Sequence, residues 1–200
     1  TAFGLYKNIL LHNRFYKSSL EIMKLNVPYI SQHRDIKDEY WQKRACGALS
    51  LKMVLDFINS NDILPDDFIK QASDQGAYSE NGWLHQGLID VAKDFEVEME
   101  REEFKSSDFE ESLFLLQKGI DKIINNLENN KPVIISAIKK WTEETKFHMM
   151  VVVGFELDKN GELKGFYYHD SDYQDEEGKD LFVSVEDFKK YWRKMVIFVK

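Results

Sequence analysis

The sequence predicts an α+β fold, with N-terminal helices packed on a C-terminal antiparallel sheet. Between residues 46 and 127 the apolar residues recur with helical spacing, whereas after Asn130 they gather in short runs rich in β-branched and aromatic residues. The turn DKNGE separates two of these runs and is typical of a hairpin between antiparallel strands. Helices first and strands afterwards indicate that the two kinds of element segregate within the domain.

Length and composition favour a single domain. The chain has 200 residues, of which 43% are hydrophobic, and a chain of this size buries well over half of the surface that it exposes when unfolded. No repeat, low-complexity tract or Pro/Gly/Ser-rich linker divides it. Because residues 1–24 have weak periodicity, we expect them to form an N-terminal extension, and residues 25–200 to form the domain.

The formal net charge of −8 argues against nucleic acid or an anionic membrane as a partner, since both are recognised through basic patches. Neutral or positively charged substrates fit this charge better. No apolar run approaches the roughly 18 residues that span a bilayer. The one cysteine cannot form an intrachain disulfide. The sequence leaves open the cytoplasm, or export with a leader absent from the chain, and it does not fix the oligomeric state.

The first predicted elements are mostly helices. Residues 25–32 are expected to form a short strand or an extended segment, because Pro28 cannot donate a ladder hydrogen bond. Helical spacing then predicts helices at residues 46–58, 66–75, 84–95 and 109–127. The last helix is expected to face the core with an apolar stripe formed by Leu113, Leu116, Ile120, Ile123, Ile124 and Leu127.

The second half of the sequence predicts a sheet. Its strands are expected at residues 131–138, 147–157, 165–172 and 195–200. They are apolar on both faces, which is typical of strands covered on both sides. Ser184 is expected to cap a short helix before the last strand.

Cys46 lies directly before Gly47 at the start of the first predicted helix. A thiol at a helix N-terminus and beside an imidazole has a lowered pKa and becomes a strong nucleophile. The glycine would let a substrate backbone approach the sulfur closely. Free cysteines are also among the most buried residues in proteins, so this stretch alone leaves open a small core residue.

His148 is the candidate base, since it begins a strand that is otherwise apolar, and a buried imidazole needs a partner or a role. Asp170, at the end of the next predicted strand, would lie near His148 if the DKNGE turn pairs the two strands, and it would fix the imidazole tautomer. His169 should point to the opposite face. A structural histidine and an ordinary strand-end carboxylate are the alternatives.

The order cysteine, histidine, aspartate, with the cysteine on a helix and the other two on a sheet, resembles the papain-like cysteine peptidases. A nearer resemblance is to the bacteriocin-processing (double-glycine leader) peptidases and their soluble relatives. It is carried by five pieces in the right order, namely VPYISQ (27–32), CGALSLKMVL (46–55), KPVIIS (131–136), HMMVVVGF (148–155) and YYHDSD (167–172). The resemblance covers residues 27 to about 200 and implies a papain-like fold, with Cys46 as nucleophile, His148 as general base and acid, and Asp170 as the orienting acceptor.

The resemblance also implies that a glutamine upstream of the cysteine donates to the oxyanion, together with the Cys46 backbone N–H. The transporter-linked members have this glutamine six positions before the cysteine, where this chain has Tyr40. Gln32 matches the soluble relatives and is our choice, with Gln42 as the alternative.

No cofactor and no metal are expected. In the acidic segment 170–180, Asp170 and Asp172 match the first and third places of an EF-hand calcium loop, but Gln174 and Asp175 replace its fifth-place ligand and its glycine. A solvated loop is the better interpretation. A single cysteine and scattered histidines exclude a closed structural zinc site.

The sequence therefore predicts a cysteine peptidase or related amide hydrolase that acts on a peptide or protein substrate. The alternatives are an acyl or peptidyl transferase that uses the same site, and a non-catalytic peptide-binding module with the same fold. The joint presence of Cys46, His148 and Asp170 favours the enzyme, because a binding module has no physical need for all three.

Overall fold

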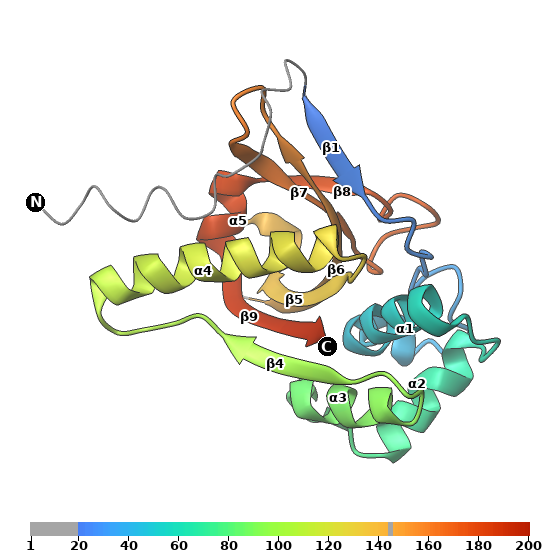
Figure 1. Cartoon of the computed structure of the whole chain (residues 1–200). Coiled ribbons are helices and arrows are strands. Elements are labelled where there is room, and N and C mark those ends of the chain that lie inside the picture. The colour runs from blue at the N-terminus through green and yellow to red at the C-terminus, as the bar shows by residue number, and fades with distance from the viewer. Residues whose placement is uncertain (1–19, 144–145) are drawn as a thin grey trace, which may run out of the picture.

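The computed structural model describes residues 20–143 and 146–200 (Figure 1). Its α-helices are α1 (Cys46–Asn59), α2 (Pro65–Asp74), α3 (His85–Lys93), α4 (Phe109–Glu128) and α5 (Val185–Tyr191). Its strands are β1 (Glu21–Lys24), β2 (Tyr78–Ser79), β3 (Gly82–Trp83), β4 (Met99–Glu103), β5 (Val133–Ile138), β6 (Phe147–Leu157), β7 (Leu163–His169), β8 (Leu181–Ser184) and β9 (Trp192–Val199). The predicted α+β fold is confirmed.

The main sheet has seven strands, ordered β4-β9-β5-β6-β7-β8, with β1 paired to β6. Every pair of neighbours is antiparallel. The long strand β6 organises the sheet, because β5 pairs with its first half and β1 with its end, while β7 follows it through the predicted hairpin. Four strands lie where the sequence predicted them, whereas β1, β4 and β8 were not predicted.

The strand β1 lies within the segment that the sequence analysis assigned to an N-terminal extension. It pairs with the end of β6, with Lys24 opposite Gly154. Residues 1–19 of the proposed extension lie outside the described residues, so the boundary at residue 24 stays a prediction. Residues 25–32 form no regular strand, but a backbone bond joins Leu25 to Val153 of β6, and another joins Gln32 to Ser171 in the loop after β7.

Helices α1, α2 and α3 contact one another and form a helical lobe beside the sheet (Figure 1). Helix α1 begins at Cys46, as predicted, and packs its buried apolar side against β6 and β5. Leu49 and Met53, four residues apart, are both fully buried. The predicted cap of α5 is also present, since the Ser184 hydroxyl accepts the backbone N–H of Asp187.

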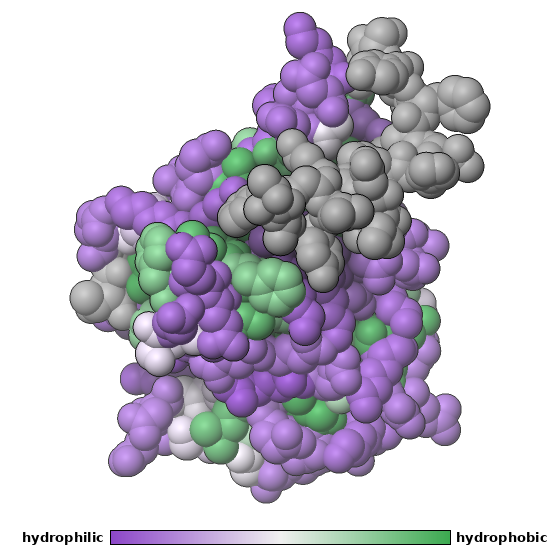
Figure 2. All heavy atoms as spheres, turned by 60° about the vertical axis from the view of Figure 1, so that its left-hand side comes forward, coloured by the Kyte–Doolittle hydropathy of each residue, from purple (hydrophilic) through white to green (hydrophobic). Residues whose placement is uncertain are grey.

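Helix α4 lies across the sheet and extends beyond it at its N-terminal end (Figure 1). Ile120, Ile123 and Leu127 are buried as predicted, but Leu113 is 48% exposed, so the predicted core-facing stripe is wrong at its start. Phe109 and Phe114 of α4 are exposed as well. Figure 2 brings the left-hand side of Figure 1 forward and shows apolar side chains at the surface. None of the helices in the described ranges is both long and apolar enough to cross a membrane.

Candidate active site

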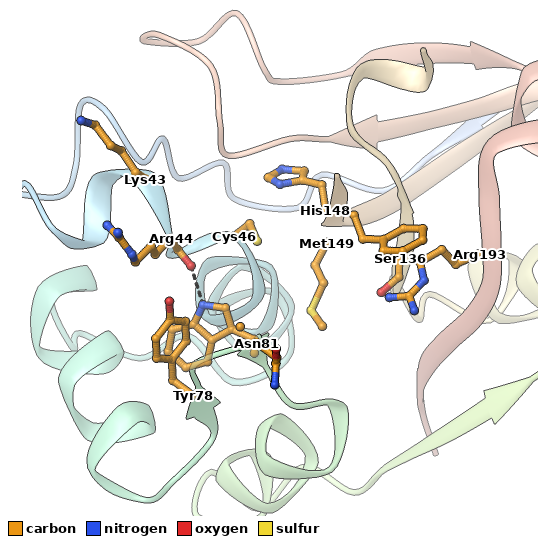
Figure 3. Close-up of a pocket in the computed structure, with 12 residues that line it drawn as sticks. Lys43, Arg44, Cys46, Tyr78, Asn81, Ser136, His148, Met149 and Arg193 are labelled. Atoms are coloured by element: carbon orange, nitrogen blue, oxygen red, sulfur yellow. Dashed lines mark hydrogen bonds between the residues drawn. The ribbon is translucent and has the colours of Figure 1, made fainter. Parts of the chain in front are cut away.

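The candidate site lies where the helical lobe meets the sheet (Figure 3). Cys46 is the first residue of α1, and His148 is the second residue of β6. The first turn of α1 holds no acidic residue and has no side-chain cap, so its free N–H groups leave a positive potential beside the sulfur. This position stabilises a thiolate at Cys46.

The β6–β7 hairpin brings His148 and Asp170 together. Nε2 of His148 lies 2.6 Å from Oδ1 of Asp170, and both side chains are buried, with 6% and 1% of their surface exposed. Oδ1 also accepts the backbone N–H of Asp172 at 2.9 Å. No donor among the described residues reaches Oδ2. The prediction that the hairpin joins these two residues is confirmed.

Cys46 and His148 form a coupled pair. Burial by itself would lower the pKa of His148, but the charges of Asp170 and Cys46 and hydrogen bonds to both raise it well above its ordinary value. Burial likewise opposes ionisation of Cys46, yet the His148 charge, a hydrogen bond to His148 and the backbone N–H of Met149 lower the pKa of the thiol. Both directions favour a thiolate–imidazolium pair.

The side-chain amides of the two candidate glutamines, Gln32 and Gln42, are held by different partners. Gln32 is 2% exposed. Its Oε1 accepts the Ser171 hydroxyl at 3.0 Å, and its Nε2 donates to the backbone carbonyl of Gln42 at 2.9 Å. The Gln42 side chain has a different partner, because its Nε2 donates to the backbone carbonyl of Ile36. Gln32 is therefore linked, through Ser171, to the segment that carries Asp170.

The expected role of Gly47 is wrong. A Cβ at this position would lie 2.6 Å from Cβ and Cγ of Trp83 and 3.0 Å from Sδ of Met149. Gly47 is buried and is needed for close packing of α1 against these side chains, rather than for approach of a substrate to the sulfur. Trp83 is fixed in turn, since its Nε1 donates to the carbonyl of Arg44 at 2.6 Å.

A pocket of about 260 Å³ opens beside Cys46 and His148. Trp83 and Met149 give it apolar walls, and Ser136 and Arg193 line it as well. Sequence reasoning missed the last two, because Ser136 lies inside an apolar strand and Arg193 in a segment with no motif. The pairing of β5 with β9 brings both residues into the lining of one pocket.

The acidic segment after β7 is occupied by ion pairs. Asp172 contacts His33 through Oδ1 at 2.9 Å and pairs with Lys139 through Oδ2. Within residues 20–143 and 146–200, no group of three or more histidine, cysteine, aspartate or glutamate side chains has the arrangement to hold a metal ion. His169 is 1% exposed and has a structural position, bonded to the carbonyl of Val27 and the backbone N–H of Asp180.

The fold is similar to solved structures of peptidases. One, described as a C39-like peptidase from Bacillus anthracis, is 18% identical, with a TM-score of 0.61, and the match covers 90% of this chain and 98% of that chain. A double glycine motif protease from an AMS/PCAT transporter, solved in complex with the leader peptide, is 18% identical with a TM-score of 0.55, covering 88% and 94% of the two chains. The peptidase domain of Streptococcus ComA, a bifunctional ABC transporter involved in quorum sensing, is 18% identical with a TM-score of 0.53, covering 92% and 98%.

These likenesses confirm the papain-like fold that the sequence predicted. No curated protein matches the chain. The sequence profile of the Peptidase C39 like family matches residues 24–197, which is most of the chain. The protein therefore belongs to the Peptidase C39 like family and is a cysteine peptidase.

Proposed function

We propose that the protein hydrolyses a peptide bond with Cys46 as nucleophile, His148 as general base and acid, Asp170 as the orienting acceptor and Gln32 as an oxyanion donor. The observation that carries the proposal is that the buried imidazole of His148 lies 2.6 Å from the Asp170 carboxylate and lines the same pocket as the Cys46 thiol, whose pKa it lowers. The Asp170 carboxylate holds Nε2, which leaves Nδ1 for Cys46. This arrangement fixes the ring orientation and stabilises its charged form.

The chemistry follows from that pair. The Cys46 thiolate attacks the scissile carbonyl carbon, and the carbonyl oxygen takes the negative charge. The His148 imidazolium gives its proton to the leaving amine as the C–N bond breaks, which leaves a thioester on Cys46. Neutral His148 then takes a proton from water, the hydroxide attacks the thioester, and the C–S bond breaks to release the thiolate and a carboxylic acid, which gives its proton to the solvent. The thiolate and the His148 imidazolium are thereby restored.

The oxyanion would be held by the backbone N–H of Cys46 and by the side chain of Gln32. The contacts of Gln32 support this choice, since its bond to Gln42 uses one of its two amide hydrogens and its Oε1 is fixed by Ser171. A donor fixed in advance needs no reorganisation when the charge develops. Gln42 is less suitable, because its own amide is directed to Ile36.

A peptide or protein is the proposed substrate. The similar transporter protease solved with a leader peptide supports this class, although at 18% identity it supports the fold rather than the peptide sequence.

The test is the pH dependence of Cys46 alkylation by iodoacetamide, measured by intact mass in the wild type and in His148→Ala. The proposal predicts fast labelling well below the ordinary thiol pKa of about 8.5, and loss of that labelling in the variant. Turnover of a quenched fluorescent peptide library is measured alongside, with Cys46→Ala as the control. Labelling only after denaturation, or equal turnover by Cys46→Ala, would overturn the proposal.

A further inference from the structure

The strand that carries Arg193 is irregular beside the pocket. Ser136 of β5 pairs with Met195 of β9, but its neighbour Ala137 pairs with Trp192. Arg193 and Lys194 are therefore two extra residues in a β-bulge, and Lys194 has a φ of +60°. A bulge turns side chains out of their regular alternation, and a non-glycine residue in the left-handed region adds strain. Here the bulge places Arg193 in the lining of the pocket.

Ser136 gives the same end of the pocket a hydrogen-bond donor. Its Oγ lies 3.0 Å from Nε2 of His85, while Nδ1 of His85 is buried without a partner among the described residues. Burial, together with the charges of Arg101 and Arg193, lowers the pKa of His85 to about 4, so its ring is neutral and carries one proton. A buried N–H without an acceptor costs more than an unused lone pair, which assigns the proton to Nε2. The Ser136 hydroxyl then accepts from His85 and keeps its own hydrogen for another acceptor.

Among the described residues, no anionic side chain pairs with the guanidinium of Arg193. It stacks on Phe147, with 3.6 Å between Cζ and the ring centroid, and forms no ion pair with any described carboxylate. The negative charge of Glu103 acts on the Arg193 guanidinium and favours its charged form, but this carboxylate already pairs with Arg101 and Lys105. Burial lowers the pKa of Arg193, as expected for a cation partly removed from water without compensation.

Basic side chains also lie on the other side of the sulfur. Figure 3 shows Lys43 and Arg44 on one side of Cys46, and Ser136 and Arg193 on the opposite side of the pocket. Neither Lys43 nor Arg44 forms an ion pair with a described carboxylate. The pocket is thus lined by basic side chains and by no carboxylate among the described residues, in a chain whose formal net charge is −8. The net charge, from which the sequence analysis favoured neutral or positively charged substrates, does not describe this pocket.

We propose that the Ser136–Arg193 end of the pocket is a subsite for a carboxylate of the substrate, which makes an acidic peptide the preferred substrate class. The carboxylate would receive hydrogen bonds from the Arg193 guanidinium and the Ser136 hydroxyl. Its source is an aspartate or glutamate side chain near the scissile bond, or the C-terminal carboxylate of the peptide. The proposal rests on the proposed function for the statement that this peptide is cleaved at Cys46.

Binding to Cys46→Ala tests the subsite without turnover. Three probes are titrated into the ¹⁵N-labelled variant: acetyl-Gly-Glu-Gly-amide, acetyl-Gly-Gln-Gly-amide, and acetyl-Gly-Gln-Gly with a free C-terminal carboxylate. We expect a carboxylate probe to bind about fivefold more tightly than the neutral probe, as for one partly screened ion pair, and to shift the amide resonances near Ser136 and Arg193. A preference for the first or the third probe assigns the carboxylate to a side chain or to the peptide C-terminus.

Substitutions decide whether Arg193 and Ser136 cause the preference. Adding Arg193→Gln should reduce the affinity ratio to about one, and Ser136→Ala should reduce it in part. Arg34→Gln is the matched control, since Arg34 pairs with Asp35 and Glu176 outside the pocket, and it should keep the full ratio. Equal affinity for charged and neutral probes at millimolar concentration, no shift near the pocket, or a preference that survives both Arg193→Gln and Ser136→Ala would overturn the subsite.

The two proposals fail in different ways. A wild-type protein that cleaves peptides without regard to acidic residues refutes the carboxylate subsite and leaves the proposed function intact. A variant series that shows the Arg193-dependent preference, in a protein whose Cys46 is unreactive, refutes the peptidase mechanism and leaves the subsite as a binding site.

Discussion

His148 Nε2 and Asp170 Oδ1 are 2.6 Å apart, although the two residues are separated by 22 positions in the chain. The β6–β7 hairpin produces this contact by pairing Val151 with His169, directly before Asp170. The contact also affects the ionisation of Cys46. Asp170 helps to raise the pKa of His148, and His148 lowers the pKa of Cys46. A substitution of Asp170 should therefore change the pKa of the Cys46 thiol.

Asp170→Asn should therefore weaken the thiolate. The amide keeps the shape but removes the charge that favours the imidazolium, so the pKa of His148 falls and the pKa of Cys46 rises. Removal of the direct repulsion between Asp170 and the thiolate acts in the opposite direction, but it is the smallest influence on Cys46. We expect half-maximal alkylation to move to higher pH and kcat/KM to fall by about tenfold or more. Asp180→Asn, in the same loop but paired with Lys24, is the control and should leave the pH profile in place.

Gln32→Ala and Gln42→Ala should separate the two candidate oxyanion donors. Loss of one such donor typically lowers kcat by about 10²- to 10³-fold. We expect this loss for Gln32→Ala, with iodoacetamide alkylation of Cys46 close to the wild-type rate, because alkylation develops no oxyanion. Gln42→Ala removes a bond to the Ile36 carbonyl and should lower stability more than kcat. The reverse pattern in kcat, with alkylation unchanged, would assign the role to Gln42.

Gly47→Ala should damage the site through packing. The added methyl would meet Trp83 at 2.6 Å, and Trp83 has little freedom because Arg44 holds its indole N–H. Overpacking of this kind costs about 1–3 kcal/mol of stability, and displacement of Trp83 should also lower turnover. Gly161→Ala adds the same methyl where nothing lies within 4 Å, at a φ of +81°. It should lower the melting temperature through backbone strain alone and leave turnover unchanged.

His85 should make the free energy of unfolding fall as the pH is lowered below 6.5. Its folded-state pKa of about 4 lies below the ordinary value of 6.5, so the unfolded chain binds the proton first as the pH falls. The contribution of the neutral ring to stability is present above pH 6.5 and is lost between pH 6.5 and 4. Relative to His85→Gln, which can still donate to Ser136, the wild type should lose up to about 2 kcal/mol of unfolding free energy from pH 7 to 4.5. Urea titrations at both pH values measure this difference, and parallel losses in the two proteins would contradict it.

Local patterns were sufficient for much of the fold. The helical spacing that starts at Cys46 predicted α1 to its first residue, and the turn after β6 predicted the hairpin that brings His148 to Asp170. Both depend on neighbours in sequence. The strands β1 and β4 were missed because they are short and at least half of their residues are charged, with exposed side chains alternating along them. β1 becomes a strand by pairing with β6, and β4 by pairing with β9. These partners are distant in the sequence, so no local pattern predicts the pairing.

The pocket was less predictable than the candidate triad. Gly47 suggested an opening for substrate, whereas contact with Trp83 from another segment decides its role. Arg193 enters the pocket only because two strands fall out of register beside Ser136, and register is a property of the assembled sheet. Leu113 kept the helical period of a buried residue, but α4 is longer than the surface beneath it. In each case the deciding neighbour is remote in the sequence.

The division of the site between α1 and β6 has a consequence for biosynthesis. A ribosome releases the N-terminal part of a chain first, so Cys46 emerges well before His148, and β9, which carries Arg193, emerges later still. The nascent thiol lacks the imidazole that lowers its pKa and behaves as an ordinary cysteine. Until the sheet has formed around β6, a nascent chain therefore has no His148 beside Cys46 to stabilise the thiolate.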